Sequence, residues 1–198
     1  MLQERIEGKW IEVFAAVFRR CDVTAGLEVA ILSETQSRPV TVALAELALL
    51  SLGARPFHVV VPTPPQRAGV AVRSTGASVA LQGSKPVVSA LGQSGMVVDC
   101  TVEGLLHAPE LPQILGAGAR VLMISNEHPE ALERLVPTAD LEAKVKAGMR
   151  RLRAAKQMHV TSPSGTDLHV SLEGPRETYL ERLSHLVANG SIAVVGDD

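Results

Sequence analysis

The sequence predicts an α/β fold in which a parallel sheet carries helices on both of its faces. Short apolar runs alternate along the chain with longer segments of helical periodicity, which is typical of such folds. The apolar runs are continuous rather than alternating, as expected of strands that are buried on both faces. The composition, 46% hydrophobic and 20% charged residues in a chain of 198, indicates a globular domain.

The first part of the chain predicts a helix, a strand and a second helix. Apolar side chains recur at helical spacing over residues 2–20. The run LEVAIL then predicts a buried strand at 27–32. A second helix follows, because Ser37 is a candidate N-cap, Pro39 suits a first turn and Gly53 suits the C-terminal end.

The middle of the chain contains the other strands of the predicted sheet. The runs PFHVVV, MVVDC and RVLMIS are short and apolar, and segments of helical character lie between them. Residues 69–83 carry no pattern that assigns them. We therefore expect strands at 56–61, 96–100 and 120–125 and helices over 85–95 and 109–118.

The C-terminal part predicts a long helix and a hairpin. The helix runs over residues 139–156 and has one apolar stripe. Two alternating segments over 158–172 flank a turn that contains Gly165, which predicts an antiparallel hairpin. The final segment, GSIAVVGDD, reads as the start of a further strand.

The bulk properties exclude several classes of partner. The net charge is −2 and aromatic residues make up 3%, so neither a basic field nor stacking platforms for nucleic acid are expected. No apolar run approaches the roughly 18 residues that cross a bilayer. The N-terminus MLQERIEGKW carries early charges and does not resemble a signal peptide. Together with the widely spaced Cys21 and Cys100, this favours a cytoplasmic protein.

The carboxyl ends of the predicted strands are the expected position of a ligand site, since open parallel sheets bind ligands there. Three loops follow those ends: SETQS, TVEGLLHAP and SNEHPE. Glu34 and Thr35 lie in the first loop, and Leu106 and His107 lie in the second. This reasoning indicates a location and leaves the reaction open. The alternative interpretation of His107 is a loop histidine that caps the helix starting at Pro109.

Common catalytic and metal-binding patterns are absent from the sequence. There is no GxGxxG after a strand, no P-loop, no GxSxG elbow and no HExxH. The nearest approach to a metal set is Asp167 with His169, which share one face of a strand. Two ligands do not make a site, and His159 shows no local partner in the sequence. We therefore expect no metal site in this chain.

Three segments together resemble a known family. LSETQSRPVTVALAELALLSLGARPFHVVVP, LLHAPELPQILGAGARVLMISNEHPEALERLVPT and SPSGTDLHVSLEG occur in this order in the 2,5-dihydroxypyridine 5,6-dioxygenases. These are non-haem iron enzymes that share a fold with the thermophilic metallo-aminopeptidases. The resemblance covers residues 5–174 and is loose over 62–90. GTDL is shared by both groups, whereas LLHAPE is similar to the dioxygenase version.

The resemblance implies a Rossmann-like parallel sheet flanked by helices, with a C-terminal hairpin. It also implies that residues 1–198 form a single N-terminal-type domain and that the metal-binding C-terminal domain is absent from this chain. In the family, two histidines and one carboxylate in that second half hold Fe(II). The chain is therefore expected to carry no cofactor of its own, although Fe(II) is implied for the full-length family.

The resemblance also implies roles for the residues at the sheet edge. His107 corresponds to a histidine proposed as an acid/base group for the ring hydroxyl, and imidazole titrates near neutral pH, at ~6.5. Leu106 would pack on the apolar face of the ring. From their position at the same sheet edge, we expect Glu34 and Thr35 to bind substrate in a cleft that they share with a partly exposed His107. The implied partner is a small aromatic substrate.

The implied function is that of the substrate-side domain of an iron-dependent ring-cleavage dioxygenase, which is expected to be inactive as this chain alone. Two alternatives stay open. One is the corresponding domain of a metallo-aminopeptidase-like hydrolase with a two-metal site. The other is a non-enzymatic relative that acts as an interaction module. We also expect a homo-oligomer, because a missing second half would expose apolar surface.

Overall fold

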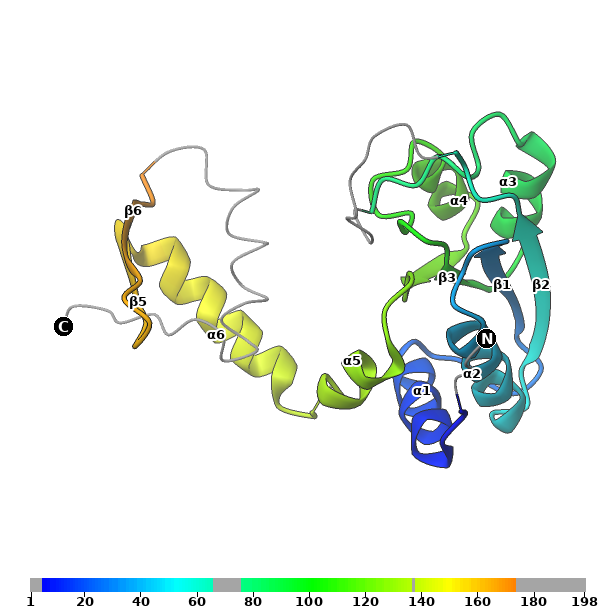
Figure 1. Cartoon of the computed structure of the whole chain (residues 1–198), viewed down its shortest axis with the longest axis horizontal. Helices are drawn as coiled ribbons and strands as arrows, with labels where there is room; N and C mark the ends of the chain where they lie inside the picture. Colours follow the sequence, from blue (N-terminus) through cyan, green and yellow to red (C-terminus); the bar gives the residue numbers. More distant parts are fainter. Residues whose placement is uncertain (1–4, 66–75, 137, 174–198) are drawn as a thin grey trace. The chain divides into compact units, whose positions relative to one another are not determined.

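The computed structural model describes residues 5–65, 76–136 and 138–173. The chain divides into two compact units, residues 1–136 and 137–198, which are described separately. Figure 1 traces both units in sequence colours. The strand expected in GSIAVVGDD lies outside the described residues, and the expectation of one domain over 1–198 stays a prediction.

The first unit contains the predicted parallel sheet. Its strands lie side by side in the order β2-β1-β3-β4, and every neighbouring pair is parallel. The chain thus leaves β1 toward one edge and then crosses back to the other side, so the strand order reverses between β1 and β3. The bounds are β1 Glu28–Glu34, β2 Arg55–Val61, β3 Met96–Cys100 and β4 Arg120–Met123.

Helices cover both faces of this sheet (Figure 1), as the sequence predicts. One face carries α1 and α2, and the other carries α3 and α4, while α5 follows β4 and lies against α1. The bounds are α1 Gly8–Arg20, α2 Pro39–Ser51, α3 Lys85–Gly92, α4 Leu111–Gly116 and α5 Pro129–Arg134.

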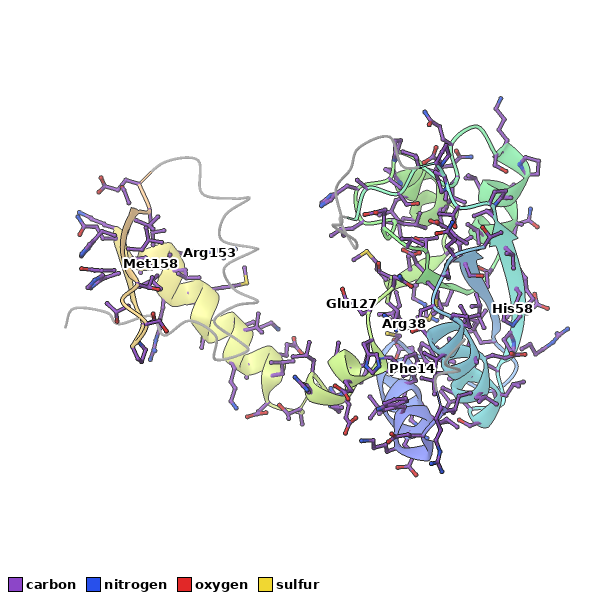
Figure 2. All side chains as sticks on the ribbon, viewed as in Figure 1. Phe14, Arg38, His58, Glu127, Arg153 and Met158 are labelled. Carbon is purple, nitrogen blue, oxygen red and sulfur yellow. The ribbon has the colours of Figure 1, made fainter. Side chains whose placement is uncertain are left out.

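Alternation along β1 divides its side chains between two cores. Val29 and Ile31 pack with α1 and α2, in the same core as Phe14, which Figure 2 labels. Ala30 and Leu32 point to the opposite face and pack with α3 and α4. Both sets are fully buried, which explains why the strand reads as an unbroken apolar run.

The N-terminal ends of α1 and α2 differ from the sequence-based expectations. The first helix begins at Gly8 rather than at residue 2, after Glu7 in an extended conformation. Ser37 does not cap α2, whose N-cap residue is Arg38. The Ser37 hydroxyl instead donates to the carbonyl oxygen of Cys100 (2.7 Å) and accepts from the N–H of Glu34 (2.7 Å). It therefore links the ends of β1 and β3, which local sequence patterns cannot reveal.

The second unit contains α6 (Leu141–Ala154) and an antiparallel hairpin of β5 (Gln157–Thr161) and β6 (Asp167–Ser171). The hairpin confirms the prediction for 158–172. Its small core is formed by Leu152 of α6 and Met158 of β5. Figure 2 labels Met158. With 14 residues α6 is the longest described helix, and no helix in the described ranges could cross a membrane.

Candidate functional site

Glu34, the last residue of β1, places a buried carboxylate at the carboxyl edge of the sheet. Its Oε1 accepts hydrogen bonds from the hydroxyl of Ser78 (3.4 Å) and the N–H of Val102 (3.3 Å). Its Oε2 is buried and has no hydrogen-bond partner within the described part of the chain. Burial raises the pKa of this carboxyl. Because an unpaired buried acceptor is costly, Oε2 is a favourable contact for a donor on a bound molecule.

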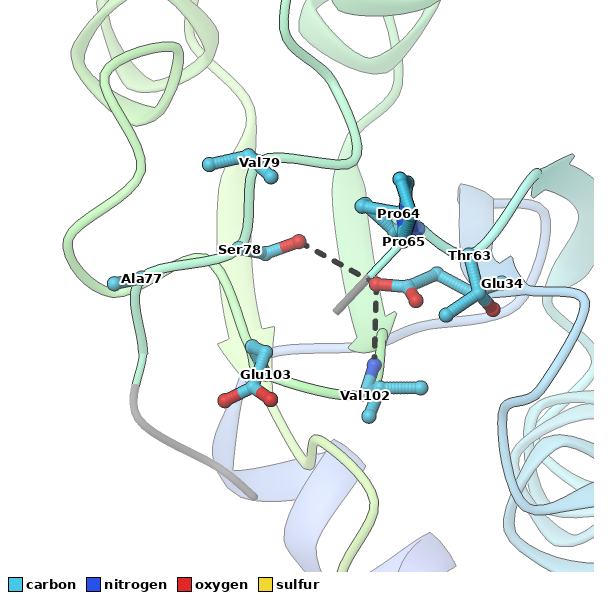
Figure 3. Close-up of a pocket in the computed structure, with 9 residues that line it drawn as sticks. All are labelled: Glu34, Thr63, Pro64, Pro65, Ala77, Ser78, Val79, Val102 and Glu103. Carbon is cyan, nitrogen blue, oxygen red and sulfur yellow. Dashed lines mark hydrogen bonds between the residues drawn. The ribbon is translucent and has the colours of Figure 1, made fainter. Parts of the chain in front are cut away.

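A pocket of about 140 Å³ lies beside Glu34. Figure 3 shows the carboxylate reaching toward Ser78 and Val102 among the lining residues. The lining comes from the end of β1, the segment after β2, the segment before α3 and the loop after β3. Apolar side chains dominate it, and its members include Thr63, Pro64, Pro65, Val79 and Val102.

Asp99 shapes the loop that follows β3. Its Oδ1 accepts from the N–H (2.9 Å) and the hydroxyl (2.6 Å) of Thr101, and its Oδ2 accepts from the N–H of Leu105 (2.7 Å). The side chain is fully buried, and burial raises its pKa while these three bonds oppose the rise. Asp99 was not among the site residues expected from the sequence. The available signal was a single carboxylate inside the otherwise apolar run MVVDC.

A backbone contact joins this loop to the segment before α3. Gly76 donates its N–H to the carbonyl of Glu103, and its own carbonyl accepts from the N–H of His107. Gly76 has φ +76°, and a Cβ built there would lie 3.0 Å from the Cβ of Leu106 and 3.2 Å from Cδ2 of His107. Only glycine permits this close approach without displacing the loop.

Leu106 and His107 lie at the predicted edge and are exposed. They are not among the residues that line the pocket beside Glu34, although Val102 and Glu103 of the same loop are. The structure therefore brings Leu106 and His107 to the same sheet edge as Glu34 without bringing them into one cavity.

Thr35 does not line the pocket but hydrogen-bonds to Thr63, which does. The two hydroxyls lie 3.3 Å apart, and the N–H of Thr63 donates to the hydroxyl of Thr35 (3.1 Å). The N–H of Thr35 also donates to the carbonyl of Val61 at the end of β2 (3.0 Å). Thr63 is the residue of this pair that lines the pocket, and the sequence reasoning did not single it out.

The hairpin of the second unit brings together Asp167, His169 and His159. Nε2 of His159 lies 2.6 Å from Oδ1 of Asp167, and Nε2 of His169 lies 3.5 Å from the same oxygen. The expectation that Asp167 and His169 lack a third potential ligand is therefore wrong. His159 has no partner nearby in the sequence, and only the register of β5 on β6 provides one.

Comparison with known proteins gives the family. The family model of NicX, 2,5-dihydroxypyridine 5,6-dioxygenase, matches residues 9–184. The chain belongs to the 2,5-dihydroxypyridine 5,6-dioxygenase family. This confirms the family that the three sequence segments indicated.

A curated relative and a solved structure, both from Pseudomonas putida KT2440, support the assignment. The 2,5-dihydroxypyridine 5,6-dioxygenase of Pseudomonas putida KT2440 is 34% identical over 163 residues, which is 81% of this chain and 46% of that protein. A solved structure of 2,5-dihydroxypyridine dioxygenase from Pseudomonas putida KT2440 matches with a TM-score of 0.68 and 32% identity. The match covers 85% of this chain and 48% of the solved one. The chain thus spans about half the length of these dioxygenases.

The sheet edge does not fit the iron that we expect in the full-length dioxygenase family. Among the described residues near it, neither Glu34 nor His107 is part of a group of three potential ligands. One such group occurs in the described ranges, and it lies in the hairpin of the second unit. The edge carries an exposed imidazole at His107, an exposed apolar side chain at Leu106 and the buried carboxylate of Glu34.

Proposed function

We propose that this chain is the substrate-side domain of a dioxygenase that acts on a dihydroxypyridine-like aromatic. The observation that carries the proposal is the loop with Leu106 and His107, held at the carboxyl edge beside the point where the strand order reverses. The relative from Pseudomonas putida KT2440, 34% identical by sequence and 32% identical in the structural comparison, is named for this reaction. Ligands of open parallel sheets bind at this position.

His107 is the proposed proton acceptor. A ring hydroxyl must lose its proton as the ring becomes electron-rich enough to react, and an exposed imidazole at neutral pH can take that proton. Leu106 precedes it and is also exposed, so it offers an apolar contact to the face of the ring. Because Leu106 and His107 do not line the pocket beside Glu34, we assign the proton transfer to the exposed face of this loop and the polar contact with the same substrate to that pocket.

Glu34 is the proposed polar contact in the neighbouring pocket. A cavity of roughly 150 Å³ can hold benzene, and the pocket here measures about 140 Å³. Oε2 of Glu34 would accept a hydrogen bond from a ring hydroxyl or ring N–H, which would satisfy a buried acceptor. Thr35 would contribute by holding Thr63 in the pocket wall.

The family match favours a dioxygenase over the aminopeptidase-like hydrolase. We propose that Fe(II) serves the complete reaction and is held by residues outside those described at this edge. We also propose a homo-oligomer, because apolar side chains such as Leu50, Val60 and Leu106 are exposed. The unpaired Cys21 and Cys100 support a reducing, cytoplasmic location.

The test is calorimetric titration of 2,5-dihydroxypyridine into the protein under anaerobic conditions. We expect saturable binding at one site per chain that weakens in a Leu106→Ala/His107→Ala double variant and persists in His58→Ala. His58 is a suitable control because it lies in the middle of β2, away from the carboxyl ends of the strands, and pairs with Glu46 (3.5 Å). No saturable binding, or equal binding by the double variant, would contradict the proposal.

Oxygen uptake with added Fe(II) separates the remaining possibilities. Binding without oxygen uptake is the result expected of a substrate-side domain that needs further residues for turnover. Iron-dependent oxygen uptake by this chain alone would show that it contains a complete active site and would overturn the domain assignment.

A further inference from the structure

The β5–β6 hairpin gathers three metal-ligating side chains on one face. His159 lies directly opposite His169, and Asp167 pairs with Thr161. Residues two apart on a strand point to the same side, so Asp167 and His169 share a face, and the register adds His159 to it. The two imidazole rings stack with centroids 3.9 Å apart and an angle of 11° between their planes. All three side chains are exposed, so an ion in solution can reach them.

A simple hydrogen-bonded pair does not account for the arrangement, because one carboxylate oxygen faces two imidazole nitrogens. One oxygen, Oδ1 of Asp167, faces Nε2 of both histidines, at 2.6 Å and 3.5 Å. A hydrogen bond to His159 satisfies one of these nitrogens and leaves the nitrogen of His169 beyond normal bonding distance. All three ligand atoms lie within 4.8 Å of one another. A single cation at their centre would satisfy the whole set.

We propose that His159, Asp167 and His169 bind one divalent first-row transition-metal ion, with Zn²⁺ as the defining probe. Zn²⁺ accepts nitrogen from His and oxygen from Asp, with metal–ligand distances of roughly 2.0–2.2 Å and ligands roughly 3.3 Å apart in a tetrahedron. The observed separations bracket that value, so small side-chain rotations complete the site. The fourth position remains open to water.

The ion would act as a cross-strand clip for the hairpin. Two-stranded sheets are marginally stable in water, and the described core of this unit is small, centred on Leu152 and Met158. A metal held by His159 from β5 and by Asp167 and His169 from β6 links the strands directly. Because it binds the folded hairpin and not an extended chain, it stabilises that register. This site is independent of the function proposed for the sheet edge.

The experiment is a calorimetric titration of Zn²⁺ into the untagged, chelator-treated full chain. We expect one Zn²⁺ per chain, and an affinity reduced about 100-fold or more in a His159→Gln/His169→Gln variant. His58→Gln is the matched control, because His58 also pairs with a carboxylate, Glu46, but lacks a third ligand in the described structure. A parallel anaerobic titration with Fe²⁺ should show weaker binding, following the usual order of affinities.

A second readout keeps the test independent of variant folding. In the wild-type chain, Zn²⁺ should shift the imidazole NMR signals of His159 and His169 and leave those of His58 unchanged. Asp167→Asn, which keeps the shape of the side chain, should weaken binding while far-UV circular dichroism stays constant. Absence of Zn²⁺ binding by the wild type, or full binding by the double variant, would overturn the proposal.

Discussion

The buried carboxylate of Asp99 in β3 accepts a hydrogen bond from the backbone N–H of Leu105 at 2.7 Å, immediately before the exposed Leu106 and His107. The same side chain binds Thr101, so one residue of the sheet fixes both ends of the intervening turn. The position of the proposed catalytic histidine therefore depends on a strand residue that touches no substrate.

Asp99→Asn should destabilise the first unit. The amide oxygen can replace Oδ1 toward Thr101, but the amide nitrogen then faces the N–H of Leu105, and two donors meet in a buried position. We expect a loss of about 1–3 kcal/mol in the free energy of unfolding, measured by urea denaturation. Asp22→Asn is the control, since Asp22 is exposed and Asn tolerates its positive φ of 55°. Equal effects of the two variants would contradict this role for Asp99.

Glu34→Gln should change how stability depends on pH. The raised pKa of Glu34 means that the folded chain holds this proton at pH values where the unfolded chain has released it. The free energy of unfolding therefore falls as pH rises from about 4.3, the ordinary value, through the raised one. Gln cannot ionise, and its oxygen can still accept from Ser78 and Val102. The difference in the free energy of unfolding between the variant and the wild type should therefore shift in favour of the variant as the pH rises from 4 to 7.

Urea titrations across this pH range measure that difference. Glu12→Gln serves as the control, because Glu12 is exposed on α1. A Glu34→Gln variant whose stability stays parallel to that of the wild type at every pH would disprove the linkage.

Gly76→Ala should displace the loop that carries His107. Gly76 and Gly83 both have φ +76°, so alanine strains the backbone equally at each position. At Gly83 a Cβ meets nothing within 4 Å, whereas at Gly76 it meets Leu106 and His107. Gly83→Ala should cost about 1–2 kcal/mol, and Gly76→Ala should cost more. Amide NMR shifts at Leu106 and His107 should change in Gly76→Ala alone; matching costs and spectra would refute the contact.

His107→Ala should lower turnover by about 10²- to 10⁴-fold in the enzyme that contains this chain, which is the usual range for a general acid/base. Thermal stability should change little, because the side chain is exposed. The measurement is steady-state kinetics on 2,5-dihydroxypyridine with matched melting curves, and His58→Ala is the control. Normal turnover in a well-folded His107→Ala protein would reduce His107 to an ordinary loop residue.

Local sequence signals were enough to predict the strands and the helices between them. The same signals predicted where the site lies. LEVAIL and MVVDC are apolar runs whose burial can be predicted without knowledge of their neighbours. The three family segments indicated the dioxygenase family. The loop with Leu106 and His107 could be placed at the carboxyl edge because every parallel strand ends there.

Only the tertiary structure decided which side chains meet. Glu34 contacts Val102 because β1 lies beside β3, and Ser37 links the ends of those strands for the same reason instead of capping α2. The contact of Glu34 with Ser78 depends on the path of the segment before α3. His159 meets Asp167 and His169 because of the cross-strand register. Periodicity reports which way a side chain points along its own element. The partner it finds depends on strand order and register, which are set by the packing of the whole unit.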